Sequence, residues 1–277
     1  MKIGLLMHLK EDAYGCIAHA AELGFDNGQL AVWNMDLYRD EIAQQIRKAC
    51  EDFSFTVTAV WTGWSGPVEW SYPNMYASIG LVPSAWRARR TQDILDGAAF
   101  ARKLGVRDII THMGFLPDDP NHPDHIGVVQ VIRHISKTIA PYGQRFLFET
   151  GEELPGSLML LMKEVGTDNI GINFDPANFL INGRANPCDA MDRLAQLVFG
   201  CHAKDGTYPQ GFDPKGKEMQ IGQGSVDFES LLKKLLAAGY PGTLTIEREI
   251  PEGPERDAQL LEEKAYLQEL IERLEAI

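Results

Sequence analysis

The sequence predicts a single α/β domain over residues 1–277, folded as a (β/α)8 TIM barrel. Short apolar segments alternate with segments of helical period along the whole chain. This alternation favours parallel strands joined by right-handed crossovers. Eight such units in about 250 residues is the usual size of the barrel. An open, doubly wound sheet is the structural alternative.

The first half of the chain contains four expected strands, each followed by a helix. The strands are short apolar or β-branched runs at residues 2–8, 25–33, 55–61 and 108–112. The helices carry apolar residues three and four positions apart, at 14–23, 40–52, 88–104 and 124–140. Ile42, Ile46 and Ala49 show this spacing in the second helix. Gly24 and Gly105 follow two of the helices as C-caps.

The second half repeats the pattern with four more pairs. Its expected strands lie at 145–149, 170–175, 197–202 and 243–247. Its expected helices lie at 156–165, 187–196, 227–238 and 255–275. The sequence Gly-Tyr-Pro-Gly at 239–242 predicts a turn into the last strand.

Two long loops interrupt this regular alternation. The first, 62–87, is rich in aromatic residues such as Trp64 and Trp70. Because aromatic rings stack on sugar faces and exclude water, we expect it to form a lid over the barrel mouth. An extra packing element or a subunit interface is the alternative. The second loop, 208–223, carries Lys215 and Lys217 and is also a candidate to close over the site.

Four acidic or imidazole side chains stand at the ends of consecutive expected strands: Glu149, Asp175, His202 and Glu247. Residues at the C-terminal ends of barrel strands carry the chemistry of this fold. Side chains along a strand alternate between its two faces, and this alternation places all four on the barrel axis at one height. Solvated charges at strand ends are the alternative interpretation.

Three carboxylates and one imidazole favour a hard or borderline divalent cation. We expect Mn²⁺, with Mg²⁺, Co²⁺ or Zn²⁺ as alternatives. Such an ion can chelate a carbonyl and an adjacent hydroxyl, which acidifies the α C–H and stabilises an enediolate. Glu149 and Glu247 lie at the two ends of the arc of ligands. One glutamate can therefore remove a proton from one face of the substrate while the other returns a proton to the opposite face.

Six segments that span the fourth to the eighth expected strand, over half of the chain, resemble the xylose isomerase-like TIM barrel superfamily, in its sugar phosphate isomerase/epimerase branch. They read Thr111-His-Met-Gly-Phe, Phe148-Glu-Thr-Gly, Asn173-Phe-Asp-Pro-Ala-Asn-Phe, Cys201-His-Ala-Lys-Asp-Gly, Ile221-Gly-Gln-Gly-Ser-Val-Asp-Phe and Leu244-Thr-Ile-Glu-Arg-Glu. The resemblance to ketose 3-epimerases implies that Glu149, Asp175, His202 and Glu247 bind one metal ion, often manganese. It also implies that Glu149 and Glu247 act as the acid/base pair.

The chain departs from the ketose epimerases at Asn178, where they usually carry a histidine; Asn178 can still hydrogen-bond a sugar hydroxyl. Endonuclease IV, a relative on the same barrel, needs more histidines than this chain offers. The resemblance implies an isomerase or epimerase of a polyhydroxy ketone, either a ketose or a keto-cyclitol. A dehydratase or lyase related to inosose dehydratases, or one that cleaves a 3-keto-glycoside, uses the same first step. A non-catalytic sugar-binding subunit is the third alternative.

Further residues are candidates for substrate contacts: His112, Asn178, Lys204, Trp61, Trp64 and His8. His112 and His8 end strands, and Lys204 shares the face of His202. A packed core histidine and a surface lysine are the alternatives for His112 and Lys204. We expect His125 to be solvated. We regard Asp205 as a weak candidate to orient His202.

The amino-acid composition limits the kinds of partner that the protein is expected to bind. The net charge is −13, from 39 acidic and 26 basic residues, and such a surface repels nucleic acid. No run approaches the about 20 apolar residues of a membrane span, and the N-terminus does not resemble a signal peptide. The four cysteines have no CxxC spacing. We therefore expect a cytoplasmic protein that binds a small sugar and, like its relatives, forms a dimer or tetramer.

Overall fold

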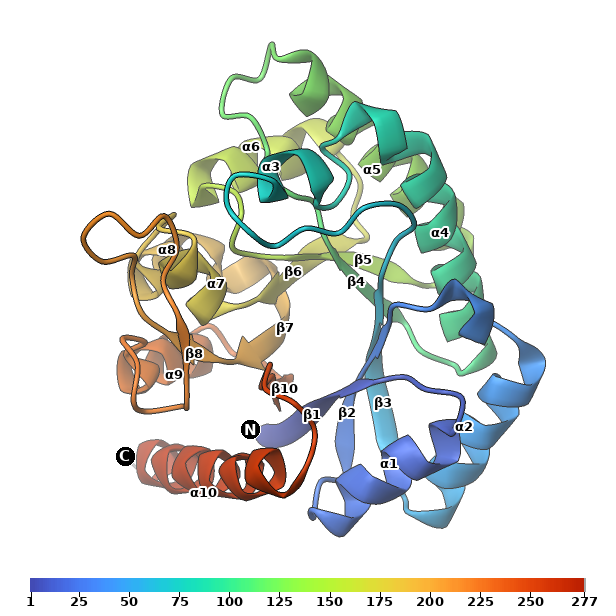
Figure 1. The fold of residues 1–277 in the computed structure, drawn as a ribbon, viewed down its shortest axis with the longest axis vertical. Coiled ribbons are helices and arrows are strands. Elements are labelled where there is room, and N and C mark those ends of the chain that lie inside the picture. Colours follow the sequence, from blue (N-terminus) through green and yellow to red (C-terminus); the bar gives the residue numbers. More distant parts are fainter. Residues whose placement is uncertain (277) are drawn as a thin grey trace.

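The structure, a computed structural model, describes residues 1–276. Within this range, eight parallel strands close into one barrel (Figure 1). The strands are β1 (Lys2–His8), β2 (Asn27–Val32), β3 (Thr56–Thr62), β4 (Asp108–His112), β5 (Arg145–Glu149), β6 (Ile170–Phe174), β7 (Val198–Ala203) and β10 (Thr243–Ile246). The ring closes between the first and last strands, where Lys2 pairs with Thr243 and Leu5 pairs with Ile246. The predicted fold class is confirmed, and the open sheet is excluded.

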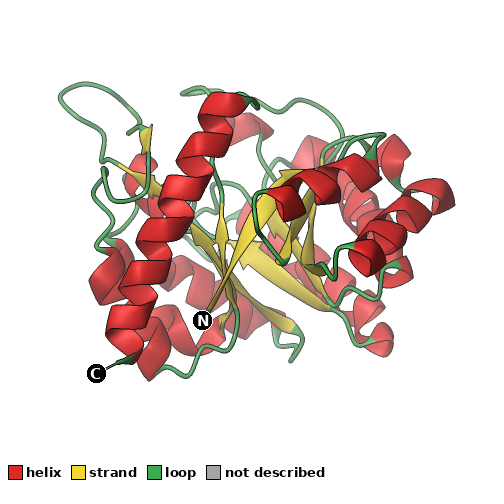
Figure 2. Ribbon diagram, turned by 90° about the horizontal axis from the view of Figure 1, so that it is seen from below, coloured by secondary structure: helices red, strands yellow, loops and turns green. Residues whose placement is uncertain are grey.

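Helices surround the ring on its outer side (Figures 1 and 2). The α-helices are α1 (Ala13–Glu22), α2 (Asp40–Asp52), α3 (Met75–Ser78), α4 (Ser84–Lys103), α5 (Pro123–Ile139), α6 (Pro155–Val165), α7 (Pro176–Ile181), α8 (Pro187–Leu194), α9 (Phe228–Ala237) and α10 (Pro254–Glu275). Three short 3₁₀ helices are η1 (Met35–Leu37), η2 (Ala140–Tyr142) and η3 (Ala195–Leu197). No helix within residues 1–276 is long and apolar enough to cross a membrane.

Three local features differ from the sequence prediction. Helix α4 begins at Ser84 rather than at residue 88, directly after Pro83, which has no backbone N–H to leave unpaired. Helix α7, which begins directly after Asp175 at the end of β6, is not among the expected helices. Two short antiparallel strands, β8 (Asp205–Gly206) and β9 (Glu218–Met219), lie in the long loop after β7.

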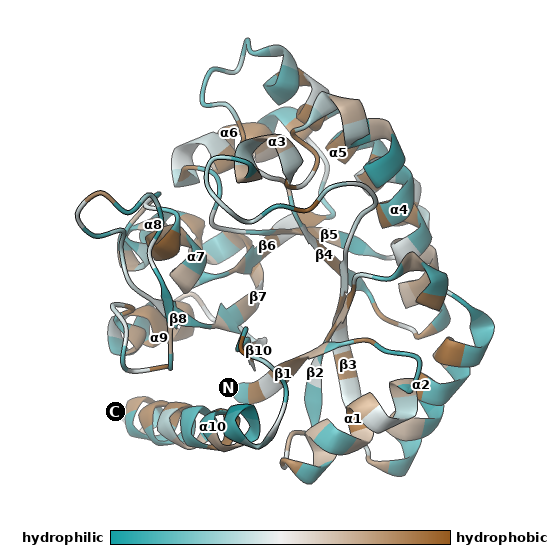
Figure 3. Ribbon diagram, in the orientation of Figure 1, coloured by the Kyte–Doolittle hydropathy of each residue, from teal (hydrophilic) through white to brown (hydrophobic). Residues whose placement is uncertain are grey.

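The apolar core has two parts, separated by the strands. The larger part lies between the strands and the helices and includes Phe146, Phe148 and Phe174, which are fully buried. The helices accordingly mix hydrophobic and hydrophilic residues along their length (Figure 3). The smaller part lies inside the barrel, where Leu6, Ala31, Ala59, Trp61, Ile110 and Leu147 project from β1 to β5. Apolar side chains thus fill the interior on one half of the ring and leave the other half to polar groups.

His125 corrects one expectation. This histidine is fully buried rather than solvated. Its Nε2 lies 2.7 Å from an oxygen of Glu164, and its Nδ1 lies 3.0 Å from the carbonyl oxygen of Pro117. It therefore links α5, α6 and the loop before α5, and it has a structural role.

Candidate metal centre

The structure brings the four predicted side chains together at the C-terminal end of the barrel. Glu149 ends β5, Asp175 follows β6, His202 lies in β7 and Glu247 follows β10. One ligand atom from each lies within 4.8 Å of the others. The group is of a kind that could hold a metal ion. All four residues are buried, and the most exposed side chain, that of Glu247, is 11% exposed.

Asp175 is placed by the start of α7. Its Oδ1 accepts a hydrogen bond from the backbone N–H of Asn178 at 2.8 Å, which makes it the N-cap of that helix. Pro176 occupies the first helical position, where its fixed φ suits a helix start. One carboxylate oxygen therefore fixes the side chain, and the other, Oδ2, faces the cluster.

His202 directs its Nδ1 into the cluster. This atom lies 2.9 Å from Glu247 Oε2, 3.1 Å from Glu149 Oε1 and 3.4 Å from Asp175 Oδ2. The opposite ring nitrogen, Nε2, lies 2.9 Å from Oε1 of Gln29 on β2. The imidazole is therefore held from behind while it presents one nitrogen to three carboxylates.

The two glutamates are held from different sides. Trp61 Nε1 donates a hydrogen bond to Glu149 Oε2, and the Asn178 amide donates to Glu149 Oε1 at 3.4 Å. Glu247 Oε2 lies 3.5 Å from Nζ of Lys204. The backbone N–H of Glu247 donates to the carbonyl oxygen of Ala203 at 3.1 Å, which continues the pairing of β10 with β7 beyond the strand.

The donor set fits a divalent cation. His202 Nδ1, Asp175 Oδ2 and Glu247 Oε2 are buried, and none has a hydrogen-bond partner within residues 1–276. These atoms lie close together, yet their approaches lack hydrogen-bond geometry. Buried polar atoms normally have partners. An ion coordinated by all of them would satisfy them together.

The charges of the protein alone keep both glutamates ionised at neutral pH. Burial opposes ionisation of Glu149, but His112 and His202 hold its pKa below the ordinary value. Burial also opposes ionisation of Glu247, whose pKa Lys204 and His202 hold well below the ordinary value. Burial raises the pKa of Asp175 to about 6. Both glutamates are therefore able to accept a proton.

A second group of charges lies beside the cluster. His112 Nδ1 lies 3.0 Å from Glu152 Oε2, and its Nε2 lies 3.7 Å from Glu149 Oε1. Burial disfavours the charged imidazole, but Glu152 and Glu149 outweigh it and raise the pKa of His112 to about 10. The ring is therefore a cation at neutral pH with a proton to donate.

A cavity of about 270 Å³ opens above the cluster. Five of the six predicted contact residues line it: His8, Trp61, His112, Asn178 and Lys204. Trp64 lies outside this lining and packs against the rings of Trp33 and Trp61. Trp70, from the loop expected to form a lid, and Glu152 also line the cavity. The sequence analysis did not identify two further lining residues, Trp33 and Glu249.

The two long loops meet over this cavity. Lys215 Nζ donates to the carbonyl oxygen of Trp70 at 3.2 Å, and the Trp70 ring lies edge-on to His112, with centroids 5.4 Å apart. Figure 1 shows the segment that carries α3 passing over the β4–β5 side of the ring. This arrangement agrees with the lid expected for the first loop.

Asp205 does not orient His202; it holds the long loop after β7 in place. Its two oxygens accept hydrogen bonds from the backbone N–H groups of Gly206, Gly222, Gly224 and Val226, at 2.7–3.0 Å. The weak expectation that Asp205 contacts His202 is therefore wrong. The partner of the His202 ring is Gln29, a buried polar residue of strand β2.

Comparisons with known proteins agree with this fold. A xylose isomerase domain protein from Planctomyces limnophilus superposes with a TM-score of 0.89 and 29% identity, covering 99% of this chain and 98% of that one. A D-tagatose 3-epimerase-like protein superposes with a TM-score of 0.78 and 20% identity, covering 100% and 99%. An uncharacterized protein of Methanocaldococcus jannaschii is 25% identical over 196 residues, which span 66% of this chain and 63% of that protein. The family model for xylose isomerase-like TIM barrels matches residues 17–276. The chain therefore belongs to the xylose isomerase-like TIM barrel family.

Proposed function

We propose that this protein is a metal-dependent isomerase or epimerase of a polyhydroxy ketone, either a ketose or a keto-cyclitol. One observation carries the proposal: two ionised glutamates and a buried Asp–His pair converge within 4.8 Å at the base of a cavity. Solved structures that share the fold include an L-ribulose 3-epimerase and an E. coli 3-keto-D-glucoside 4-epimerase. These neighbours support the reaction class.

Glu149, Asp175, His202 and Glu247 would hold the ion. When bound, a divalent cation polarises a ketone carbonyl with its neighbouring hydroxyl and makes the adjacent C–H more acidic. Mn²⁺ remains our proposal for the ion, and a neighbour from Mycobacterium smegmatis in complex with magnesium supports a hard divalent cation. The carboxylate-rich donor set suits both ions.

The protein side chains would move the proton. Glu149 and Glu247 come from β5 and from the end of β10, strands separated in the ring by β6 and β7. One glutamate accepts the α-proton from one face of the substrate. The other glutamate, after taking up a proton from solvent, donates it to the opposite face, and the carbon is inverted. The first glutamate then returns its proton to solvent.

The cavity lining suits a small polyol. Trp33, Trp61 and Trp70 offer aromatic faces, on which the C–H face of a sugar ring can pack. Asn178 and Lys204 offer hydrogen-bond donors for hydroxyl groups. Water exclusion by the two loops would strengthen the polar contacts made inside.

The test is exchange of substrate α-protons with solvent. We expect NMR in D₂O to show Mn²⁺-dependent deuterium incorporation into at least one member of a ketose and keto-cyclitol panel. Glu247→Gln is expected to slow this exchange by about 10²–10⁴-fold. Glu269→Gln is the control, because Glu269 is an exposed carboxyl on α10 that lies outside both the cluster and the cavity lining. Absence of metal-dependent exchange across the panel contradicts the proposal.

A dehydratase is the second candidate, and the His112–Glu152 pair favours it. A cationic His112 beside Glu149 is placed to protonate a departing β-hydroxyl after α-proton removal. A solved neighbour of the same fold is a probable 3-DHS dehydratase. Product analysis separates the two reactions: an enone that absorbs in the ultraviolet indicates elimination, and an isomeric sugar indicates epimerisation.

A further inference from the structure

A buried glutamine on the far side of the barrel contacts the metal-site histidine. Gln29 lies in β2, is 3% exposed and faces the barrel axis. Its Oε1 lies 2.9 Å from Nε2 of His202, and its Nε2 donates to Oδ1 of Asn173 at 3.1 Å. The contact crosses the barrel interior, because β2 and β7 are not neighbours in the sheet.

We propose that Gln29 is a positioning residue that holds His202 with its hydrogen on Nε2, so that Nδ1 is free to bind the metal. A neutral imidazole carries one hydrogen, and a ring that uses Nδ1 as a ligand must keep that hydrogen on Nε2. The Gln29 carbonyl oxygen is the acceptor for it. A hydrogen-bond acceptor at the ring nitrogen that does not bind the metal fixes both the tautomer and the orientation of a metal-binding histidine.

Two neighbouring residues fix the direction of the Gln29 amide. Asn173 Oδ1 takes one hydrogen of the Gln29 NH₂ group, which turns the Gln29 oxygen toward His202. Gly200 makes room for Asn173, because a Cβ on Gly200 would lie 2.3 Å from Asn173 Oδ1. Gly200, Asn173 and Gln29 therefore form a continuous support for the Nε2 side of the imidazole.

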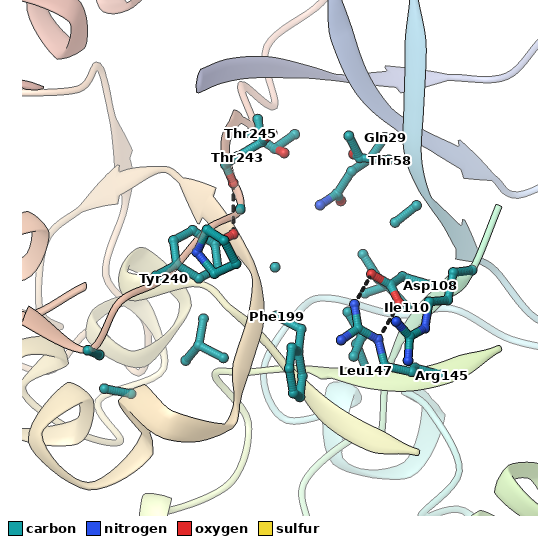
Figure 4. Close-up of a pocket in the computed structure, with 18 of the residues that line it drawn as sticks. Gln29, Thr58, Asp108, Ile110, Arg145, Leu147, Phe199, Tyr240, Thr243 and Thr245 are labelled. Carbon is teal, nitrogen blue, oxygen red and sulfur yellow. Dashed lines mark hydrogen bonds and ion pairs between the residues drawn. The ribbon is translucent and has the colours of Figure 1, made fainter. Parts of the chain in front are cut away.

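The space below Gln29 makes this role testable. Gln29 lines a cavity of about 510 Å³ at the N-terminal end of the barrel, opposite the metal cluster, together with Thr58, Thr243 and Thr245 (Figure 4). Since this side is open, two hydrogen bonds rather than tight packing define the position of the amide. A side chain of similar length can replace Gln29 without steric conflict from below.

The role rests on the proposed metal site, and the first experiment measures metal affinity without measuring turnover. Metal-stripped protein is titrated with Mn²⁺, and the free ion is followed by electron paramagnetic resonance. We expect Gln29→Met, which removes the acceptor, to weaken binding about 10–100-fold. Gln29→Glu should restore binding, because a carboxylate accepts the same hydrogen and Asn173 can turn its amide to donate. Thr243→Val is the control, since Thr243 lines the same cavity but does not contact His202.

The second experiment needs no metal. Protein labelled with ¹⁵N-histidine should show a slowly exchanging Nε2–H signal from His202 in the wild type, and Gln29→Met should lose it. If the wild type binds no divalent ion, the proposed function fails, and this signal alone decides the role of Gln29. A signal absent from the wild type, or unchanged in Gln29→Met, overturns the inference. An Mn²⁺ affinity of Gln29→Met equal to that of the wild type also overturns the inference. If circular dichroism shows that Gln29→Met is unfolded, both experiments use Gln29→Leu instead.

Discussion

Glu153 makes a contribution to the pH dependence of folding that a single substitution can isolate. It lies just after β5 and is 1% exposed. Burial, reinforced by the neighbouring Glu152, raises its pKa to about 8 from an ordinary value of 4.5. In the unfolded chain the same group regains water and its ordinary pKa. The folded protein therefore keeps this proton at pH values where the unfolded chain has lost it.

The size and sign of the effect follow from this difference. Between pH 4.5 and 8 the Glu153 carboxyl is protonated in the folded state and ionised in the unfolded state, so its contribution to the free energy of unfolding falls as pH rises. Each pH unit in this interval corresponds to about 1.4 kcal/mol. The contribution is fully present below pH 4.5, and about 5 kcal/mol is lost by pH 8. A glutamine at this position is neutral at every pH and escapes the loss.

Urea unfolding of wild type and Glu153→Gln, followed by circular dichroism from pH 4.5 to 8.5 in EDTA, tests this reasoning. The variant is expected to unfold with similar free energy at the acid end and to become progressively more stable than the wild type toward pH 8. Glu269→Gln, which removes an exposed carboxyl on α10, controls for the change in net charge. A stability difference between wild type and Glu153→Gln that stays constant across this range refutes the assignment.

Three further predictions concern the cluster and the loop. Mn²⁺ at about one hundred times its Kd should raise the free energy of unfolding by about 2.7 kcal/mol. Asp175→Asn should remove most of this gain. Thermal unfolding with and without EDTA measures both effects. Gly200→Ala should cost about 1–3 kcal/mol in urea unfolding, because its Cβ would overlap Asn173; Gly156→Ala, whose Cβ has room, is the control. Asp205→Ala should speed limited proteolysis between residues 205 and 226, since four backbone N–H groups lose their acceptor.

The sequence predicted the barrel and the four ligand positions because both follow from local periodicity. A strand alternates its faces with period two, so Leu147 and Glu149 share one face, as do Asn173 and Asp175. Parallel neighbours keep this order in register: Glu149 pairs with Asn173 in the sheet. Once consecutive strands are recognised, their ends must therefore meet at one mouth.

Contacts that cross the barrel could not be predicted in this way. Gln29 and His202 lie on strands that do not pair, and nothing local in the sequence relates them. Trp64 and Trp70 belong to the same aromatic segment, and only the path of the chain decides that Trp70 lines the cavity. The burial of His125 depends on Glu164 in the next helix, which is likewise a long-range contact.

The charge balance of the cluster yields a last prediction. Glu149, Asp175 and Glu247 carry three negative charges when all are ionised, and His202 is neutral when it acts as a ligand. The Lys204 ammonium, 3% exposed, lies 3.5 Å from Glu247 and 2.8 Å from Glu249. The His112 cation is offset by Glu152, and Glu249, at 57% exposed, is screened by solvent. Three carboxylates against one ammonium therefore leave two negative charges at the cluster, and a divalent ion would neutralise them.

Lys204→Met removes the ammonium but keeps the length of the buried side chain. The cluster then holds a larger negative charge, so Mn²⁺ should bind more tightly than in the wild type. Substrate proton exchange should become slower, because a hydrogen-bond donor in the cavity is lost. Opposite changes in metal affinity and exchange rate distinguish this electrostatic role from general damage to the fold, which would weaken both. Weaker Mn²⁺ binding in Lys204→Met, with the protein folded, contradicts the charge balance.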